Sequence, residues 1–379
     1  MTPSAAACHG PAPGTLAWMP DVLTWSSGPE RDPAVLERLH DDWRRWALGR
    51  LSATLGELEA AAPERVAPLA GELRDLPPEA LERVLLAPEV TFRLRGLAPS
   101  PPGVIADQLR DWIAAERARA HPIPPPGRTL WTARGDGWVE PSGAFAWGPR
   151  IEGWIPIDVQ SPWSLDIDLT GAEYRIPVPR APIDGCELAA LLAALGRTRA
   201  GIEEASPLLG GFVARFTKVL VLQRDPQPGF TSGSNCHFLG RSVLGNPQQA
   251  TDADLAEAIV HEAIHALLTV QEERAPWVLD EELWRPVPRL RSPWSGRALP
   301  VRPFLQACFV WYGVLHFWVL ATGGPAFDER RATALLRRAV AGFMSDAIPD
   351  ALAPLERQLS AEVFTAVHEM KERVVRLVG

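Results

Sequence analysis

The stretch AEAIVHEAIHALL, residues 256–268, places His261 and His265 four positions apart, with Glu262 beside the first histidine. Apolar residues fill most of the other positions, which is typical of a buried α-helix. Residues four apart on a helix share one face, about one turn from each other. Two imidazoles at this spacing can coordinate one metal ion, as in the H-E-x-x-H motif. The stretch therefore predicts a metal-binding helix, and two ordinary histidines on a helix are the alternative.

A third ligand is needed, and its identity decides the chemistry. Glu281 or Glu282 would complete a zinc-hydrolase arrangement in which Glu262 polarises a metal-bound water. Both glutamates also fit a solvated acidic turn. The other option lies in the apolar stretch that follows, where His316 is a better donor than Gln306 by ligand chemistry. His316 equally fits a hydrogen-bonded core histidine.

The composition predicts a soluble, cytoplasmic protein. The chain has 379 residues, a length that suits two domains, with 46% hydrophobic and 22% charged residues. Its net charge of −8, without a basic block, argues against nucleic acid as a partner. The four cysteines lack CxxC spacing and are expected to be reduced thiols. We find neither a signal-peptide pattern at the N-terminus nor an unbroken apolar run long enough for a membrane span.

The first third of the chain is expected to be helical. Residues 1–30 are rich in Pro, Gly and Ala and predict irregular structure. Helical periodicity follows over 33–73, 75–96 and 103–120. A proline cluster at 122–126 then places the end of a helical N-terminal region, 1–125, near residue 125.

The remainder, 126–379, is expected to be an α+β metal-binding domain, so that the fold class is α+β and mostly helical. Short β-type runs are predicted in 129–139, 144–159 and 164–169, and further strands in 217–225 and 237–245 with a loop over 225–236 between them. Helices are predicted over 186–216, from Thr251–Asp254 through the two histidines, over 303–321 and from about 328 to 378. Residues 275–303 predict a long loop.

An ordered set of sequence blocks resembles a known family. The blocks are LPPEALERVLLAPEV, SGSNCHFLGRSVL, VHEAIHALL, SPWSGRALPVRP and an apolar helix that starts FLQACF and reaches FW. In this order, along about 300 residues, they resemble the HExxH-motif peptide-modification proteins of bacterial ribosomal-peptide (RiPP) gene clusters. Each block is weak alone, and the order makes the set moderately specific.

The resemblance implies an iron- and 2-oxoglutarate-dependent oxygenase that hydroxylates a β-carbon in a precursor peptide. By it, His261 and His265 bind Fe(II), and Glu262 orients a ligand or a bound water instead of acting as a protease base. Arg302 matches a family arginine, for which we expect bidentate binding of a 2-oxoglutarate carboxylate. Trp294 belongs to a Pro-Trp element that is expected to wall the site, with core packing as its alternative role.

One departure from the family concerns the third ligand. Many relatives have a histidine where Gln306 stands, and another branch has one where Trp311 stands. Either His316 replaces it, or Gln306 ligates weakly, or the site is degenerate. The three hypotheses are therefore the peptide hydroxylase with Fe(II) and 2-oxoglutarate, a zinc metallopeptidase, and a non-catalytic peptide-binding protein. Because imidazole binds both iron and zinc, the sequence does not separate the two metals.

Overall fold

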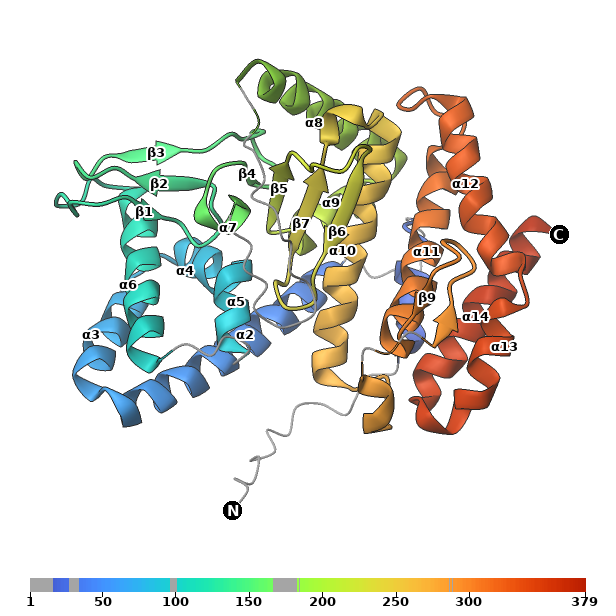
Figure 1. Cartoon of the computed structure of the whole chain (residues 1–379), viewed down its shortest axis with the longest axis horizontal. Helices are drawn as coiled ribbons and strands as arrows, with labels where there is room; N and C mark the ends of the chain where they lie inside the picture. Colours follow the sequence, from blue (N-terminus) through green and yellow to red (C-terminus); the bar gives the residue numbers. More distant parts are fainter. Residues whose placement is uncertain are drawn as a thin grey trace. The chain divides into compact units, whose positions relative to one another are not determined.

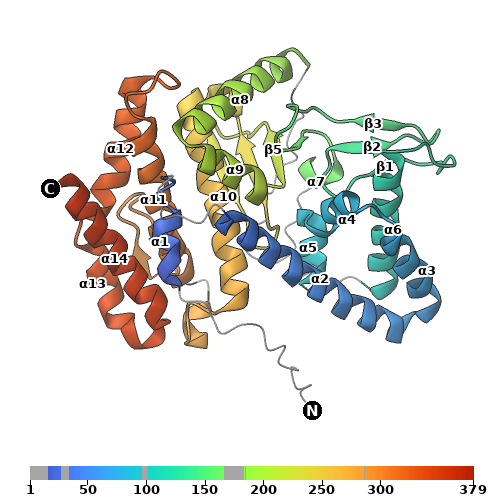
Figure 2. The same cartoon turned by 180° about the vertical axis from the view of Figure 1, so that it is seen from behind.

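The protein is mostly helical with small sheets, as the α+β prediction requires. The computed structural model describes residues 16–26, 34–95, 101–165, 183, 185–285, 287 and 289–379 (Figures 1 and 2). Two compact units divide the chain: unit 1 comprises 1–26, 271–319 and 333–379, and unit 2 comprises 27–270 and 320–332. The boundary predicted near residue 125 falls within unit 2, and a division at that point stays a prediction.

Among the residues that the structure describes, unit 2 begins with five helices and a three-stranded sheet. The helices are α2 (Val35–Ala61), α3 (Pro63–Arg74), α4 (Pro78–Leu85), α5 (Pro88–Leu94) and α6 (Pro102–Ala118). Proline starts the last four of them, because its fixed φ suits the first helical position, where no N–H is needed. The described residues of the predicted helical stretches are mostly helical, although 33–73 divides into α2 and α3, and 75–96 into α4 and α5, where a proline begins a new helix. The antiparallel sheet that follows contains β1 (Leu130–Trp131), β2 (Gly137–Val139) and β3 (Phe145–Trp147), in that order.

The second sheet of unit 2 has the order β4-β5-β7-β6. Its strands are β4 (Ile157–Asp158), β5 (Val219–Gln223), β6 (Thr231–Ser234) and β7 (Arg241–Gly245). β4, β5 and β7 run parallel, and β6 is an antiparallel edge strand. Every residue of β5 is buried, as expected for a central parallel strand. The short helix α7 (Pro162–Leu165) follows β4, the 3-10 helix η2 (Pro247–Gln249) follows β7, and α10 (Asp252–Arg274) comes next.

Three predictions for unit 2 are corrected. Residues 225–236 are not all loop, since they contain β6. The predicted helix 186–216 is two helices, α8 (Gly185–Ala205) and α9 (Pro207–Phe216), because the Ser206 side chain caps α9 by accepting from the Leu209 N–H (3.2 Å) and Pro207 starts a new helix. Ser164 and Leu165 belong to α7, not to a strand, and the rest of the predicted strand 164–169 lies outside the described residues.

Unit 1 combines both ends of the chain. It contains η1 (Leu16–Trp18), α1 (Met19–Val22), η3 (Glu281–Trp284), β8 (Leu290–Arg291), β9 (Ala298–Leu299), α13 (Ala347–Leu352), η4 (Ala353–Gln358) and α14 (Ala361–Val378), with most of α11 (Val301–Ala321) and α12 (Glu329–Met344). Residues 16–26 are folded, with Leu16, Met19, Leu23 and Trp25 buried, so the prediction of irregular structure is wrong for them. Residues 1–15 and 27–30 lie outside the described residues.

The helix α11 is the most apolar element. By length and composition it could cross a membrane, but 72% of its most apolar window is buried inside the protein. Such burial is what the core helix of a soluble protein shows, and it agrees with the predicted buried helix over 303–321.

Candidate metal centre

The helix α10 is fixed at its start by a reciprocal cap. The Thr251 hydroxyl donates to Asp254 Oδ2 (2.7 Å), and the Asp254 N–H donates to the Thr251 hydroxyl (3.2 Å). The negative charges of Asp252 and Asp254 in the first turn also interact favourably with the positive end of the helix dipole. The predicted start at Thr251–Asp254 is thereby confirmed. The apolar side chains of Ile259, Val260, Ile264, Leu267 and Leu268 are completely buried, so the helix is held on most of its faces.

Two of the three predicted metal ligands, His261 and His265, lie together with Glu262 on this helix, whereas His316 belongs to α11. The ligand atoms of His261, Glu262 and His265 all lie within 4.8 Å of one another, and the two imidazole ring centres are 5.0 Å apart. Both histidines are half-buried and Glu262 is buried. In the part of the chain that the structure describes, this is the one group of three histidine, cysteine or acidic side chains close enough to share a metal ion. The donor set and its spacing fit a first-row divalent cation.

Glu262 is bonded to the edge strand of the second sheet. Ser232 Oγ on β6 donates to Glu262 Oε1 at 3.0 Å, and Figure 1 shows β6 beside α10. Glu262 is only 4% exposed as a residue, so the Ser232 hydroxyl provides a hydrogen bond to a buried side chain. The motif helix is thus linked to an exposed strand within one unit.

Sequence reasoning missed Ser232. The strand Thr231-Ser-Gly-Ser has no apolar alternation and contains turn-forming residues, so its sequence is typical of a loop. It becomes a strand by pairing with β7, in the register Thr231 to Gly245 and Ser234 to Ser242. Asn246, just after β7, holds the preceding loop by donating to the carbonyls of Gln227 (2.7 Å) and Gly229 (3.1 Å). No local sequence signal reports these contacts.

Arg302 and Gln306, in unit 1, are both bonded to a carboxylate that the sequence analysis did not single out. Arg302 Nε (2.5 Å) and Gln306 Nε2 (2.9 Å) donate to Glu272 Oε2. Burial raises the pKa of the Glu272 carboxyl, while Arg302 and Gln306 oppose that shift. The predicted 2-oxoglutarate arginine therefore already has an internal carboxylate partner.

Trp294 and His316 are packed in unit 1. Trp294 stacks on Trp311 with ring centres 5.8 Å apart and donates through Nε1 to the Ala339 carbonyl (3.0 Å). The His316 ring lies 4.5 Å from that of Tyr312. Trp294 is half-buried and packs on Trp311. The roles of Trp294 as a pocket wall and of His316 as a third metal ligand stay predictions.

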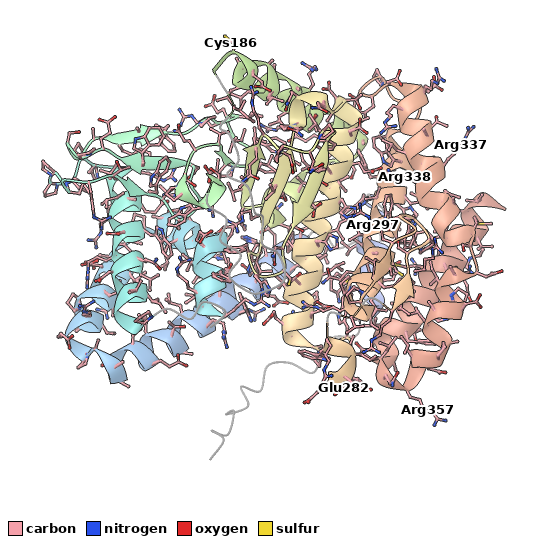
Figure 3. All side chains as sticks on the ribbon, in the orientation of Figure 1. Cys186, Glu282, Arg297, Arg337, Arg338 and Arg357 are labelled. Carbon is pink, nitrogen blue, oxygen red and sulfur yellow. The ribbon has the colours of Figure 1, made fainter. Side chains whose placement is uncertain are left out.

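Glu281 and Glu282 belong to η3, where Asp280 Oδ1 accepts from the Glu282 N–H (2.9 Å). Glu282 lies at the surface in Figure 3 and pairs with Arg285. Both glutamates are exposed, as in the solvated acidic turn that was the alternative to metal ligation.

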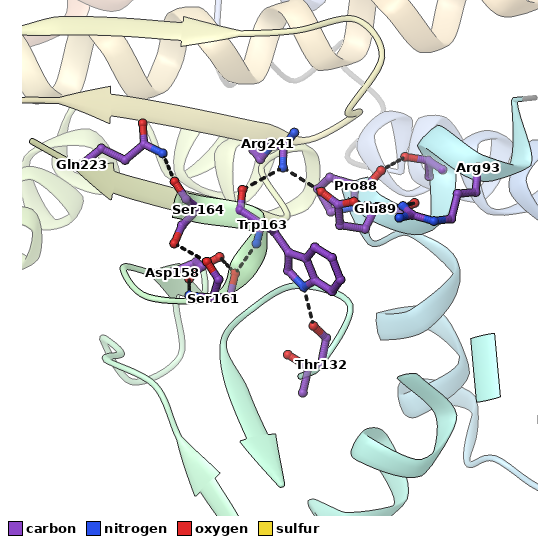
Figure 4. Close-up of polar contacts among 11 residues, drawn as sticks. Pro88, Glu89, Arg93, Thr132, Asp158, Ser161, Trp163, Ser164, Gln223 and Arg241 are labelled. Atoms are coloured by element: carbon purple, nitrogen blue, oxygen red, sulfur yellow. Dashed lines mark hydrogen bonds and ion pairs between the residues drawn. The ribbon is translucent and has the colours of Figure 1, made fainter. Parts of the chain in front are cut away.

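A second polar cluster, shown in Figure 4, joins the helical region to the second sheet within unit 2. Arg241 of β7 donates to Glu89 of α5 (2.8 Å), and Glu89 also accepts from Arg93 (2.9 Å). Beside them the buried Asp158 carboxylate accepts from the Ser161 N–H (3.0 Å) and hydroxyl. Burial raises the pKa of Asp158 to about 6, although the Ser161 hydrogen bonds oppose the shift. The cluster holds β7, and with it β6, against α5.

No protein-family model matches the chain, and no curated protein matches it.

Proposed function

We propose that this protein is a metal-dependent enzyme that modifies a peptide, with Fe(II)- and 2-oxoglutarate-dependent hydroxylation of a β-carbon as its reaction. The observation that carries the proposal is the convergence of His261, Glu262 and His265 next to an exposed edge strand. The ordered family blocks favour the oxygenase among metal-dependent reactions.

His261 and His265 would hold the metal through their ring nitrogens. When bound, Fe(II) with 2-oxoglutarate supplies the oxidising power for C–H hydroxylation. Glu262, fixed by the Ser232 hydroxyl, would orient a metal-bound water or a ligand by hydrogen bonding. Arg302 would bind a 2-oxoglutarate carboxylate through its terminal nitrogens, because Glu272 takes the Nε side of the guanidinium. We expect Trp294 and Gln306 to contribute to the surroundings of that carboxylate.

The strand β6 supports a peptide as the substrate. It lies at the edge of its sheet, and its residues are exposed except for the half-buried Gly233. Its small side chains leave the backbone open to an added strand, and a Cβ at Gly233 would meet nothing within 4 Å. An extended peptide paired with β6 would lie close to Ser232 of that strand and therefore close to Glu262. No bulky side chain on β6 selects a sequence, so recognition there would use mainly the peptide backbone.

The test is incubation of the purified protein with Fe(II), 2-oxoglutarate and a precursor peptide encoded in the same gene cluster. Hydroxylation adds one oxygen, about 16 mass units, and releases succinate. His261→Ala and His265→Ala should abolish both products, while His121→Ala, at an exposed histidine, should leave them unchanged. Absence of any mass gain, with metal and peptide both shown to bind, would contradict the proposal.

A zinc hydrolase is the second candidate, and the position of Glu262 favours it. A buried carboxylate whose oxygen lies within 4.8 Å of both imidazole donors is placed to activate a metal-bound water. Peptide cleavage with Zn²⁺ and without 2-oxoglutarate would establish this reaction and exclude the oxygenase.

A non-catalytic peptide-binding role is the third. Protein purified without chelators and found free of metal, yet able to bind the peptide, would establish that role.

A further inference from the structure

The three-stranded sheet ends in an edge strand, β3, whose outer backbone groups have no partner among the described residues. The Gly148 N–H donates to the Asp136 carbonyl (2.9 Å), which sets the alternation of the β2–β3 pair. Because bonded and non-bonded positions alternate in an antiparallel pair, the backbone of Ala146 faces β2. The N–H and C=O groups of Phe145 and Trp147 consequently face outward.

This edge has none of the usual protection against strand pairing. Phe145, Ala146 and Trp147 include no charged residue and no proline. Trp147 is 48% exposed and lies beside these outward backbone groups. An open edge with an exposed aromatic residue indicates a surface for another chain.

A cation lies beside the edge. The guanidinium of Arg150 stacks on the Trp147 ring at 4.6 Å from its centre. Arg150 is exposed, and no carboxylate in the described part of the chain lies within ion-pair distance of it. By contrast, Arg119, which stacks on the same ring at 4.8 Å, is already paired with Glu116 (3.0 Å) and Asp136. Arg150 is thus the charge that a ligand can neutralise.

One face of the β1–β3 sheet packs against α6. Leu130 and Val139 form a buried cluster with Ala115 and Ala118 of α6, and Phe145 packs against it. Trp131 and Trp138 lie on the opposite face, with ring centres 5.1 Å apart. A preformed edge of this kind lowers the entropy cost of adding a strand.

We propose that β3 binds an extended peptide segment that carries carboxylates, as a fourth strand of the β1–β3 sheet. The outward groups of Phe145 and Trp147 would pair with its backbone, and Arg150 would pair with an acidic side chain. A second copy of this chain is a weaker choice, because an edge of three residues buries far less than the roughly 1,200 Å² of a stable interface. The inference is independent of the metal centre, since it needs neither metal nor turnover.

Hydrogen exchange at single-residue resolution tests the proposal on the full chain. The probe is a short capped peptide of alternating glutamate and valine. Its addition should slow exchange of the Phe145 and Trp147 amides and leave that of Ala146, already paired with β2, unchanged. The same peptide N-methylated at every residue should give no protection, because it has no N–H groups to pair.

Charge recognition is tested by affinity. At low salt, a matched peptide of alternating lysine and valine should bind several-fold more weakly than the glutamate peptide. The Arg150→Gln substitution should weaken binding of the glutamate peptide by a similar factor, up to about tenfold. Arg337→Gln, at an exposed arginine of α12, is the matched control and should change nothing.

Three results would overturn the proposal. The first is unchanged exchange of Phe145 and Trp147 up to millimolar glutamate peptide. The second is equal binding of the lysine and glutamate peptides. The third is protection of these amides without peptide that grows with protein concentration, which would assign the edge to a second copy of the chain.

Discussion

The carboxylate of Glu262 depends on a hydroxyl from a residue thirty positions earlier in the chain. Ser232 lies at the surface, yet its Oγ donates to an oxygen that is almost completely buried. A buried acceptor that loses its donor costs the protein the desolvation of that group. The contact therefore links the stability of unit 2 to the residue beside the two histidines of the candidate metal centre.

We predict that Ser232→Ala lowers the free energy of unfolding by about 1–3 kcal/mol. Ser234→Ala is the matched control, since Ser234 is exposed on the same strand, and its effect should stay within about 0.5 kcal/mol. Urea unfolding of metal-free protein measures both. Equal stabilities of the two variants would show that the Ser232 hydroxyl contributes nothing.

Asp158 makes the stability depend on pH. Its folded-state pKa of about 6 lies above its ordinary value of 3.8, because burial disfavours the charged form. The folded protein therefore holds this proton more tightly than the unfolded chain. The resulting stabilisation is complete below pH 3.8 and is lost as the pH rises through about 6.

We predict that Asp158→Asn removes this dependence. Relative to the variant, the natural protein should lose roughly 3 kcal/mol between pH 4 and pH 7, at about 1.4 kcal/mol per pH unit of pKa difference. The comparison of the two proteins at each pH cancels the titration of the other carboxylates. A stability difference that stays constant over this range, measured by urea unfolding, would rule out the raised pKa of Asp158.

At the scale of elements, the packing of α12 illustrates how close contacts restrict side-chain size. A Cβ at Gly342 would lie 2.0 Å from Trp294 Nε1, which is fixed by its bond to Ala339 and its stack on Trp311. Helix propensity alone would favour alanine at this position, and the steric conflict outweighs it.

We predict that Gly342→Ala destabilises the protein by about 1–3 kcal/mol. Gly49→Ala in α2 should do the opposite and stabilise by about 0.5–1 kcal/mol, because nothing lies within 4 Å of a Cβ there. Thermal unfolding distinguishes the two signs. Stabilisation by both substitutions would mean that Trp294 moves away at little cost.

Elements were predictable where the signal was local. The helix start near Pro78 and the capped start of α10 follow from residues close together in sequence, whereas the new helices that begin at Pro63 and Pro88 were not predicted. The strand β6 did not, because its four small residues acquire extended structure only through pairing with β7. The break at Ser206 was missed because apolar periodicity continues across it, and only the cap and Pro207 mark it.

For the whole molecule, the N-terminal segment proves to be part of a core. Trp25 is 1% exposed, and its Nε1 donates to the Gly313 carbonyl of α11 (2.7 Å). Arg373 of α14 pairs with Asp21 in the same segment, and α1 packs on α14. Unit 1 is therefore closed by residues that lie far apart in the chain.

We predict that Trp25→Ala destabilises unit 1 by about 3–5 kcal/mol, through lost packing and a lost hydrogen bond. Trp284→Ala, at a tryptophan that is 64% exposed, is the matched control and should cost much less. Differential scanning calorimetry reads both. A small effect at Trp25 would show that the segment is dispensable for the fold.

The sequence by itself determined the helix that carries the candidate metal ligands, its N-terminal cap and the shared face of His261 and His265. All of these depend on residues a few positions apart, for which helical geometry is enough. Only the tertiary structure decided that Ser232 holds Glu262, that Glu272 holds Arg302 and Gln306, and that Trp25 belongs to a core. These contacts join residues separated by about 30 to 290 positions. Packing and burial in the folded protein decide which residues make these contacts, and the sequence contains no periodic pattern that predicts them.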